Sequence, residues 1–132
     1  MNFARVIPNN IRQILNGKSP MIWKGSEKST REFLYIEDAV DAYLSLVDNI
    51  DKTKGEAYNI GSGEIFTIEE LLNSLLNTMN SDLEIEYVEK DFPEISHQYL
   101  DSSKIKEHTG WKPETSLFVG LQKSVDCYKE LI

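Results

Sequence analysis

The chain has 132 residues, of which 40% are hydrophobic and 27% charged, a composition that indicates one globular domain and excludes a disordered chain. Its formal net charge of -8, with no stripe of lysine and arginine, excludes general nucleic-acid binding, because nothing would release counterions from a phosphate backbone. No run of about eighteen apolar residues and no signal peptide are present, so we expect a cytoplasmic protein. The single Cys127 cannot form an internal disulfide, and no Cys or His cluster has metal-ligand spacing, so we expect no metal site.

The first predicted elements are a helix and a short strand. Apolar residues recur at helical spacing from Arg5 to Leu15, and Gly17 stands just past the end. After a Ser-Pro break, residues 21–23 read as a short strand. The last of them, Trp23, either packs in the core or flanks a planar group of a ligand.

A scarce residue type, arginine, opens the next segment. Only three arginines occur beside eleven lysines, and Arg31 stands between a polar loop and an apolar alternating run. Its forked donors match two phosphate or carboxylate oxygens at once. Two readings remain open: Arg31 binds an anion at the mouth of a strand, or it pairs with Glu32, Glu37 or Asp38 on a solvated edge.

A second helix is predicted from Ala39 to Ile50. Glu37 and Asp38 precede it, where the helix dipole favours negative charge, so we interpret both as helix-start residues rather than catalytic acids. The face expected to enter the core comprises Ala39, Val40, Tyr43, Leu46, Val47 and Ile50.

A strand, a glycine turn and a helix are predicted in the middle of the chain. Residues 57–60 form the strand, Gly61-Ser62-Gly63 the turn, and residues 67–70 a capping box that opens the helix. The core stripe of this helix comprises Ile68, Leu71, Leu72, Leu75, Leu76 and Met79. The turn either cradles a phosphate through its backbone N–H groups or simply connects the strand to the helix. It matches neither a Rossmann fingerprint nor a Walker loop.

Three further elements complete the prediction. Apolar and acidic residues alternate over residues 83–87, which predicts a strand with one solvent-exposed face. A short helix follows residues 101–103 and stops at Gly110, and a final helix begins near Leu117. No nucleophile elbow or triad pattern is present. His97, in an irregular polar stretch, is a candidate for ligand contact. From the residues alone, the chain is a soluble α/β domain with a possible anion site.

Taken together, several segments resemble a known family. They read "RVIPNNIRQILNGKSPMIWKGSEKSTREFLYIEDAVDAYL", "GEAYNIGSGEIFTIEEL" and "HQYLDSSKIKEHTGWKPETSLFVGLQKSV". In this order and spacing they resemble the C-terminal half of the extended short-chain dehydrogenases/reductases that act on nucleotide sugars, the NDP-sugar 4-epimerases and 4,6-dehydratases. The resemblance covers the chain from Asn2 to Leu131, and "HQYLD" leans toward the glucose dehydratase-like members.

That resemblance implies a domain organisation. Such enzymes join an N-terminal Rossmann lobe, which holds NAD and a Tyr-x-x-x-Lys catalytic pair, to a smaller lobe that binds the substrate. None of the six tyrosines here has a lysine four residues later, and the glycine fingerprint is incomplete. We therefore expect residues 1–132 to be the small mixed α/β substrate-binding lobe alone, with no catalytic residue and no cofactor of its own. NAD is expected in the full-length enzyme.

The resemblance also implies site residues. The family's phosphate- or ribose-binding arginine corresponds to Arg31, and the asparagine of "YNIG" to Asn59 in the same pocket. The basic residue that opens "RVIP" corresponds to Arg5, beside the base and ribose, and the aromatic of the short strand to Trp23, near the base. His97 stands where many relatives carry a second arginine, which is a departure from the family pattern.

The resulting prediction is the nucleoside-diphosphate-sugar-binding lobe of an NAD-dependent epimerase or 4,6-dehydratase, inactive in isolation. Its expected partners are a nucleotide sugar and the missing Rossmann lobe, without nucleic acid or membrane. The alternative is a stand-alone, non-catalytic binding or interaction domain that retains the scaffold.

Overall fold

The computed structural model describes residues 5–89 and 95–131. In chain order its elements are α1 (Val6–Leu15), β1 (Met21–Trp23), β2 (Thr30–Glu32), α2 (Ile36–Asp48), α3 (Ile50–Thr53), β3 (Ile65–Thr67), α4 (Ile68–Thr78), β4 (Glu86–Val88), β5 (His97–Gln98), α5 (Ser103–Thr109) and α6 (Leu117–Leu131). The mixed α/β class expected from the sequence is confirmed. No helix in the described ranges is long and apolar enough to span a membrane.

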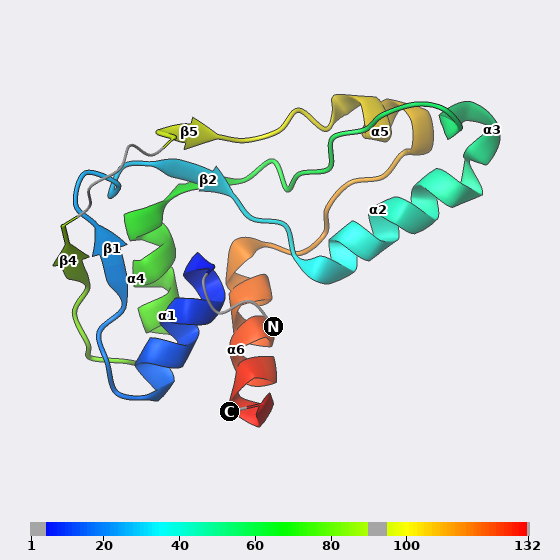
Figure 1. Ribbon diagram of the computed structural model, residues 1–132. Helices are drawn as coiled ribbons and strands as arrows, with labels where there is room; N and C mark the ends of the chain where they lie inside the picture. The colour runs from blue at the N-terminus through cyan, green and yellow to red at the C-terminus, as the bar shows by residue number, and fades with distance from the viewer. Residues whose placement is uncertain (1–4, 90–94, 132) are drawn as a thin grey trace.

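Three helices make the main core. α1, α4 and α6 pack on one another in the part of the molecule that we call the body (Figure 1). Their buried side chains are Ile11, Ile14, Leu71, Leu75, Leu76, Leu121 and Val125. α4 begins with the predicted capping box, in which Thr67 Oγ1 accepts from the N–H of Glu70 and the Glu70 carboxylate accepts from the N–H of Thr67. The predicted α4 stripe is thus confirmed as core, because every residue of it except the half-buried Met79 is buried.

Two small sheets border the body. β1 pairs in parallel with β4, while β2 lies between β3, its antiparallel neighbour, and β5, its parallel neighbour. The predicted strand over 83–87 forms only at 86–88. β3 and β5 were not predicted, because runs of two or three residues show no alternation in sequence and depend on the strand beside them.

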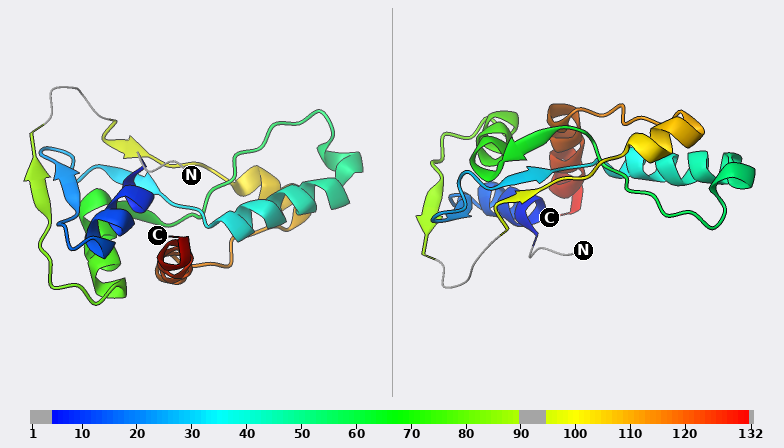
Figure 2. Two further views of the ribbon diagram at one scale, coloured as in Figure 1. Left: turned by 60° about the horizontal axis from the view of Figure 1, so that its bottom comes forward. Right: turned by 90° about the horizontal axis from the view of Figure 1, so that it is seen from above.

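A second unit projects from the body. α2, α3 and α5 form an arm that extends away from the three-helix core in every view (Figures 1 and 2). Its own core is small: Ala42, Ile105 and Trp111 are buried, and partly buried residues surround them. The carboxylate of Asp38, which is 4% exposed, accepts from the N–H groups of Glu114 and Thr115 and so ties α2 to the segment that enters α6.

The predicted core face of α2 is largely wrong. Val40, Tyr43, Val47 and Ile50 are 49–67% exposed, whereas Ala42, on the opposite side, is fully buried. The reason is that the small core of the arm covers only one side of α2, and no described residue covers the other. The helix also begins at Ile36, so Glu37 and Asp38 lie in its first turn, as the prediction of helix-start residues requires.

The predicted strand at residues 57–60 is wrong as well. The segment has no strand assignment, although its side chains alternate as in a strand: Tyr58 and Ile60 point into the core of the arm, and Ala57 and Asn59 are exposed. The physical reason is that it has no neighbouring strand within the described residues.

Candidate functional site

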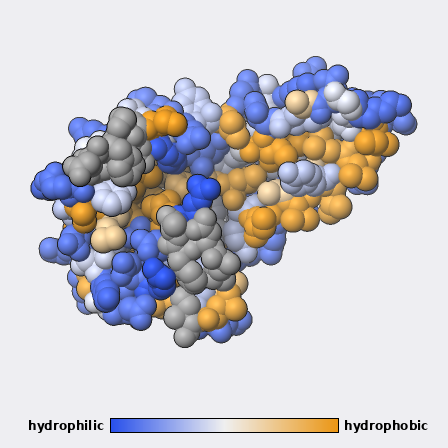
Figure 3. All heavy atoms as spheres, in the orientation of Figure 1, coloured by the Kyte–Doolittle hydropathy of each residue, from blue (hydrophilic) through white to orange (hydrophobic). Residues whose placement is uncertain are grey.

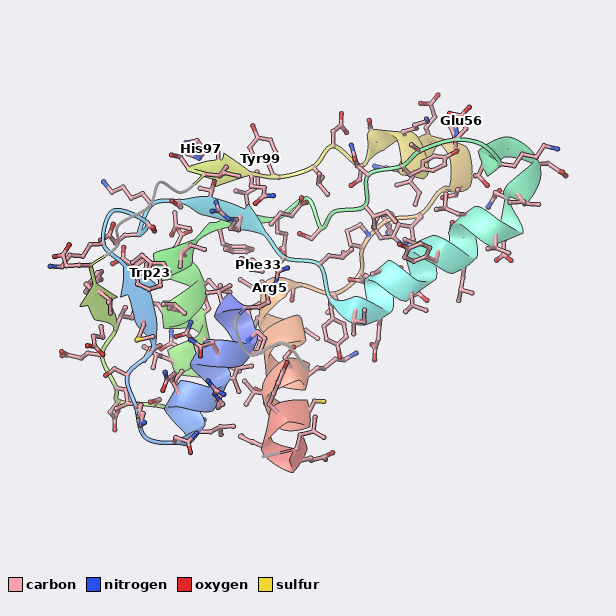
Figure 4. The ribbon with its side chains drawn as sticks, viewed as in Figure 1. Arg5, Trp23, Phe33, Glu56, His97 and Tyr99 are labelled. Carbon is pink, nitrogen blue, oxygen red and sulfur yellow. The ribbon has the colours of Figure 1, made fainter. Side chains whose placement is uncertain are left out.

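The principal cavity lies in the body. It has a volume of about 570 Å³ and is lined by residues of α1, β1, β2, α4, β4 and β5. Its apolar wall includes Ile22, Phe33 and Ile68, and its polar wall includes Arg5, Arg31, Glu32, Asn10 and Gln98. Figure 4 shows Arg5, Trp23 and Phe33 on this side of the body, while Glu56 lies at the far end of the arm.

The first turn of α1 borders the cavity. Arg5 occupies the N-cap position in extended conformation without a side-chain cap, and the turn contains no acidic residue. Val6 and Ile7, whose N–H groups have no carbonyl partner within the helix, also line the cavity. A helix N-terminus with a basic residue beside it favours an anion.

Asn10 holds this helix start in place. It is 2% exposed, its Nδ2 donates to the carbonyl of Val6 at 2.8 Å, and its Oδ1 accepts from the N–H of Met21 at 2.8 Å. One side chain therefore fixes the first turn of α1 against β1, which carries Trp23. Trp23 is 41% exposed and lines the cavity, so it belongs to the cavity wall rather than to the core.

Arg31 approaches the cavity from the central strand of the three-stranded sheet. It lies opposite Phe66 on β3 and Gln98 on β5, is half-buried, and donates from Nη1 to the carbonyl of Thr30 at 2.8 Å. Gln98 lines the same cavity. Sequence reasoning missed Gln98, although it stands beside His97 in the "HQYLD" segment.

Three of the five predicted site residues meet here. Arg5, Trp23 and Arg31 line one cavity, whereas Asn59 and His97 do not. Asn59 is exposed on the arm, and His97 is exposed on β5 with its Nδ1 2.9 Å from Thr30 Oγ1. The structure therefore brings Arg5, Trp23 and Arg31 together at one cavity and leaves Asn59 and His97 outside it.

Two backbone N–H groups of the glycine turn donate to side chains of the same protein. The N–H of Gly63 donates to Glu32 Oε1 at 2.5 Å, the N–H of Gly61 donates to Ser102 Oγ at 2.8 Å, and Glu32 Oε2 accepts from the N–H of Leu100 at 2.9 Å. A Cβ on Gly61 would lie 2.5 Å from Glu32 Oε1. The glycine turn therefore connects segments of the protein, and it does not fit the pyrophosphate of a dinucleotide.

None of the described groups with a shifted pKa lines the cavity. A hydrogen bond and the charge of Lys104 lower the pKa of Glu56 on the arm. No group of three His, Cys, Asp or Glu side chains in the described ranges is arranged to hold a metal. The cavity thus offers cations, oriented amides and an aromatic ring, a combination suited to binding an anion that carries a planar group.

The chain is similar in sequence to known proteins over nearly its whole length. Residues 2–61 match the model of the NAD dependent epimerase/dehydratase family. The chain is 33% identical to UDP-N-acetyl-alpha-D-glucosaminuronate decarboxylase of Bacillus cytotoxicus over 98% of its own length and 41% of that protein. It is 34% identical to dTDP-glucose 4,6-dehydratase of Escherichia coli over 94% of its length and 36% of that protein.

Solved structures show the same fold. UDP-glucose 4-epimerase of Thermotoga maritima, solved with UDP-glucose, superposes with a TM-score of 0.86 at 28% identity, covering 96% of this chain and 40% of that one. The chain spans between 29% and 45% of the length of these relatives, and the matched region is the C-terminal part of the solved structures. By sequence and by fold the chain is therefore similar, as a fragment, to enzymes of the NAD-dependent epimerase/dehydratase family.

Proposed function

We propose that this chain is the nucleoside-diphosphate-sugar-binding lobe of a longer NAD-dependent enzyme. One observation carries the proposal: the first turn of α1, Arg5 and Arg31 converge on a single cavity that Trp23 also lines. In a protein of net charge -8, a diphosphate is bound only where local donors outweigh long-range repulsion. Each charge-assisted hydrogen bond contributes roughly 1.5–3 kcal/mol.

The residues suggest a division of roles. Arg31 and the first-turn amides of α1 bind phosphate oxygens, and Arg5 lies beside the ribose or base. Trp23 contacts the base, and Gln98 offers a neutral amide from the adjacent strand. Contacts of Asn59 and His97 with the ligand stay predictions, since both lie outside the cavity of this chain. Because the relatives include a decarboxylase, a dehydratase and an epimerase, the proposal concerns the nucleotide sugar that their names share rather than one reaction.

The proposal assigns no redox step to this chain. NAD supplies hydride transfer in enzymes that hold it. The glycine turn of this chain does not fit the cofactor, because Glu32 and Ser102 already bind its amides. We therefore expect no turnover from the chain in isolation and place NAD binding in the longer protein.

Calorimetric titration of the chain with UDP, dTDP, CDP and GDP tests the proposal. We expect saturable binding of at least one nucleotide, weakened at least about 10-fold by Arg31→Ala, because one charge-assisted bond of roughly 1.5–3 kcal/mol is lost. Arg12→Ala is the matched control, since Arg12 is an exposed arginine of α1 outside the cavity. Equal binding by both variants, or none by the parent chain, would contradict this role and favour the alternative of a non-catalytic interaction domain.

A further inference from the structure

The carboxylate of Glu32 holds the segments on both sides of β2. Oε1 accepts from the N–H of Gly63, two residues before β3, at 2.5 Å, and Oε2 accepts from the N–H of Leu100, two residues after β5, at 2.9 Å. β2 is the central strand of this sheet, with β3 on one side and β5 on the other. One side chain therefore ties all three strands together at the same end of the sheet.

Thr30 holds the other end of β5. Its N–H donates to the carbonyl of Ser96 at 2.7 Å, and its Oγ1 lies 2.9 Å from Nδ1 of His97. β5 has only two residues, so its own ladder with β2 supplies few hydrogen bonds to fix it. The side chains of Thr30 and Glu32 therefore fasten the two ends of β5 to the central strand.

The residue held between these two contacts is Gln98. It lies opposite Arg31 in the register of β2 and β5, and both residues line the cavity of the body. That cavity has polar and apolar walls, and Figure 3 shows the same mixture over the surface of the body. Gln98 is an exposed residue, so its place beside Arg31 depends on the backbone that carries it. A strand held before binding spares the ligand the cost of ordering it.

The charge of Glu32 distinguishes two roles for this residue. Glu32 also lines the cavity, so by charge alone its carboxylate opposes the binding of an anion there. Its two accepted hydrogen bonds instead give it the role of holding the cavity wall. The two roles predict opposite results when the charge is removed: tighter anion binding in the first case and weaker binding in the second.

We propose that Glu32 is a positioning residue for the ligand of the cavity. It holds β5 so that the side-chain amide of Gln98 and the guanidinium of Arg31 bind the same phosphate-bearing ligand, and Thr30 does the same at the other end of β5. The inference deepens the proposed function and rests on it, because it takes that ligand to be a nucleoside diphosphate. An acidic residue thereby supports the binding of an anion.

Calorimetric titration of Glu32→Gln with UDP, dTDP, CDP and GDP tests the sign of the effect. Glutamine keeps the shape of the side chain but has one acceptor oxygen, so it can accept only one of the two N–H groups. We expect binding to weaken about 3- to 10-fold, the effect of one lost neutral hydrogen bond. Glu84→Gln is the matched control, because it removes the same charge at an exposed position outside the cavity. It should change binding by less than about 2-fold.

A double-mutant cycle shows whether Glu32 acts through Gln98. Gln98→Ala should weaken binding by a similar factor, and the double variant Glu32→Gln/Gln98→Ala should bind no more weakly than Gln98→Ala alone, because the positioned amide is already absent. A general loss of structure would instead add to the effect of Gln98→Ala. Thr30→Val removes the hydroxyl beside His97, and it should also weaken binding in the parent chain but not in the Gln98→Ala background.

Three outcomes would overturn the inference and leave the proposed function intact. They are unchanged or tighter binding by Glu32→Gln, additive losses in the double variant, and equal losses in Glu32→Gln and Glu84→Gln. If circular dichroism shows that Glu32→Gln does not fold, Thr30→Val replaces it in the same cycle, where additive losses or unchanged binding overturn the inference. A parent chain that binds none of the four nucleotides contradicts the proposed function itself, and the inference falls with it.

Discussion

The helices α4 of the body and α2 of the arm show the same apolar pattern, but they differ in whether other residues cover the apolar side. In α4, every predicted stripe residue from Ile68 to Leu76 is buried, whereas in α2 most of the predicted stripe is exposed. Both helices show apolar residues at helical spacing. The difference teaches that such a pattern predicts a packing partner, and among the described residues only the body contains that partner.

The largest expected effect is the loss of stability when a buried side chain of the body is shortened, compared with an exposed one of the arm. Leu75→Ala, at a fully buried position of α4, should lower the free energy of unfolding by about 2–5 kcal/mol because it leaves a cavity. Val47→Ala, at a 64% exposed position of α2, should change it by less than about 0.5 kcal/mol. Urea denaturation of the isolated chain measures both, and equal losses would contradict the distinction between body and arm.

The junction of arm and body should show the next largest effect. Asp38→Ala removes the buried acceptor of two backbone N–H groups, those of Glu114 and Thr115, and should destabilise the chain by about 1–3 kcal/mol. Asp41→Ala, at an exposed position one turn away, is the control and should be nearly neutral. Thermal unfolding followed by circular dichroism measures both, and a silent Asp38→Ala would mean that the junction does not depend on this carboxylate.

The glycine turn offers a test of steric fit. Gly61→Ala places a Cβ against the Glu32 carboxylate and should cost about 1–3 kcal/mol. In a Glu32→Ala background the same substitution should cost less, since the crowding atoms are gone. A double-mutant cycle by urea denaturation gives the coupling, and additive effects would contradict the close packing of these two residues.

The smallest effect concerns pH and the arm. Lys104 Nζ lies 2.7 Å from Glu56 Oε2, which lowers the pKa of Glu56 from its ordinary value of 4.5 and raises that of Lys104 from 10.5. The contribution of Glu56 to folding stability is present above the pKa that it has in the unfolded chain, and it is lost as the pH falls through the lowered pKa of the folded state. That of Lys104 is present below its unfolded pKa and is lost as the pH rises through the raised value.

The pair therefore stabilises the arm between about pH 5 and pH 10. Because both side chains are substantially exposed, solvent screens the interaction and the effect should be small. Glu56→Gln should lower the stability of the chain slightly at pH 7 and leave it unchanged at a pH below the lowered pKa of Glu56. Urea midpoints at the two pH values check this, and a loss of equal size at both would assign the effect to packing instead.

Several features of the fold follow from local sequence. The capping box at Thr67 and Glu70, the α4 stripe and the stop at Gly110 depend on neighbours within a few positions, and all three are present in the structure. Gln98 and β5 could not be predicted, since a two-residue strand exists only because β2 lies beside it. The occupation of the glycine turn by Glu32 joins residues 31 positions apart, and no local pattern signals it.

The sequence by itself determined the α/β class, the positions of the long helices and, through its motifs, the likeness to the epimerase/dehydratase family, because helix patterns and caps are local and the motifs stand in the order of the chain. Only the tertiary structure decided that Arg5, Trp23 and Arg31 share one cavity, that Asn59 and His97 lie outside it, and that the stripe of α2 remains exposed. The physical reason is that a periodic pattern specifies which side of an element seeks contact, whereas the partner on that side is set by long-range packing.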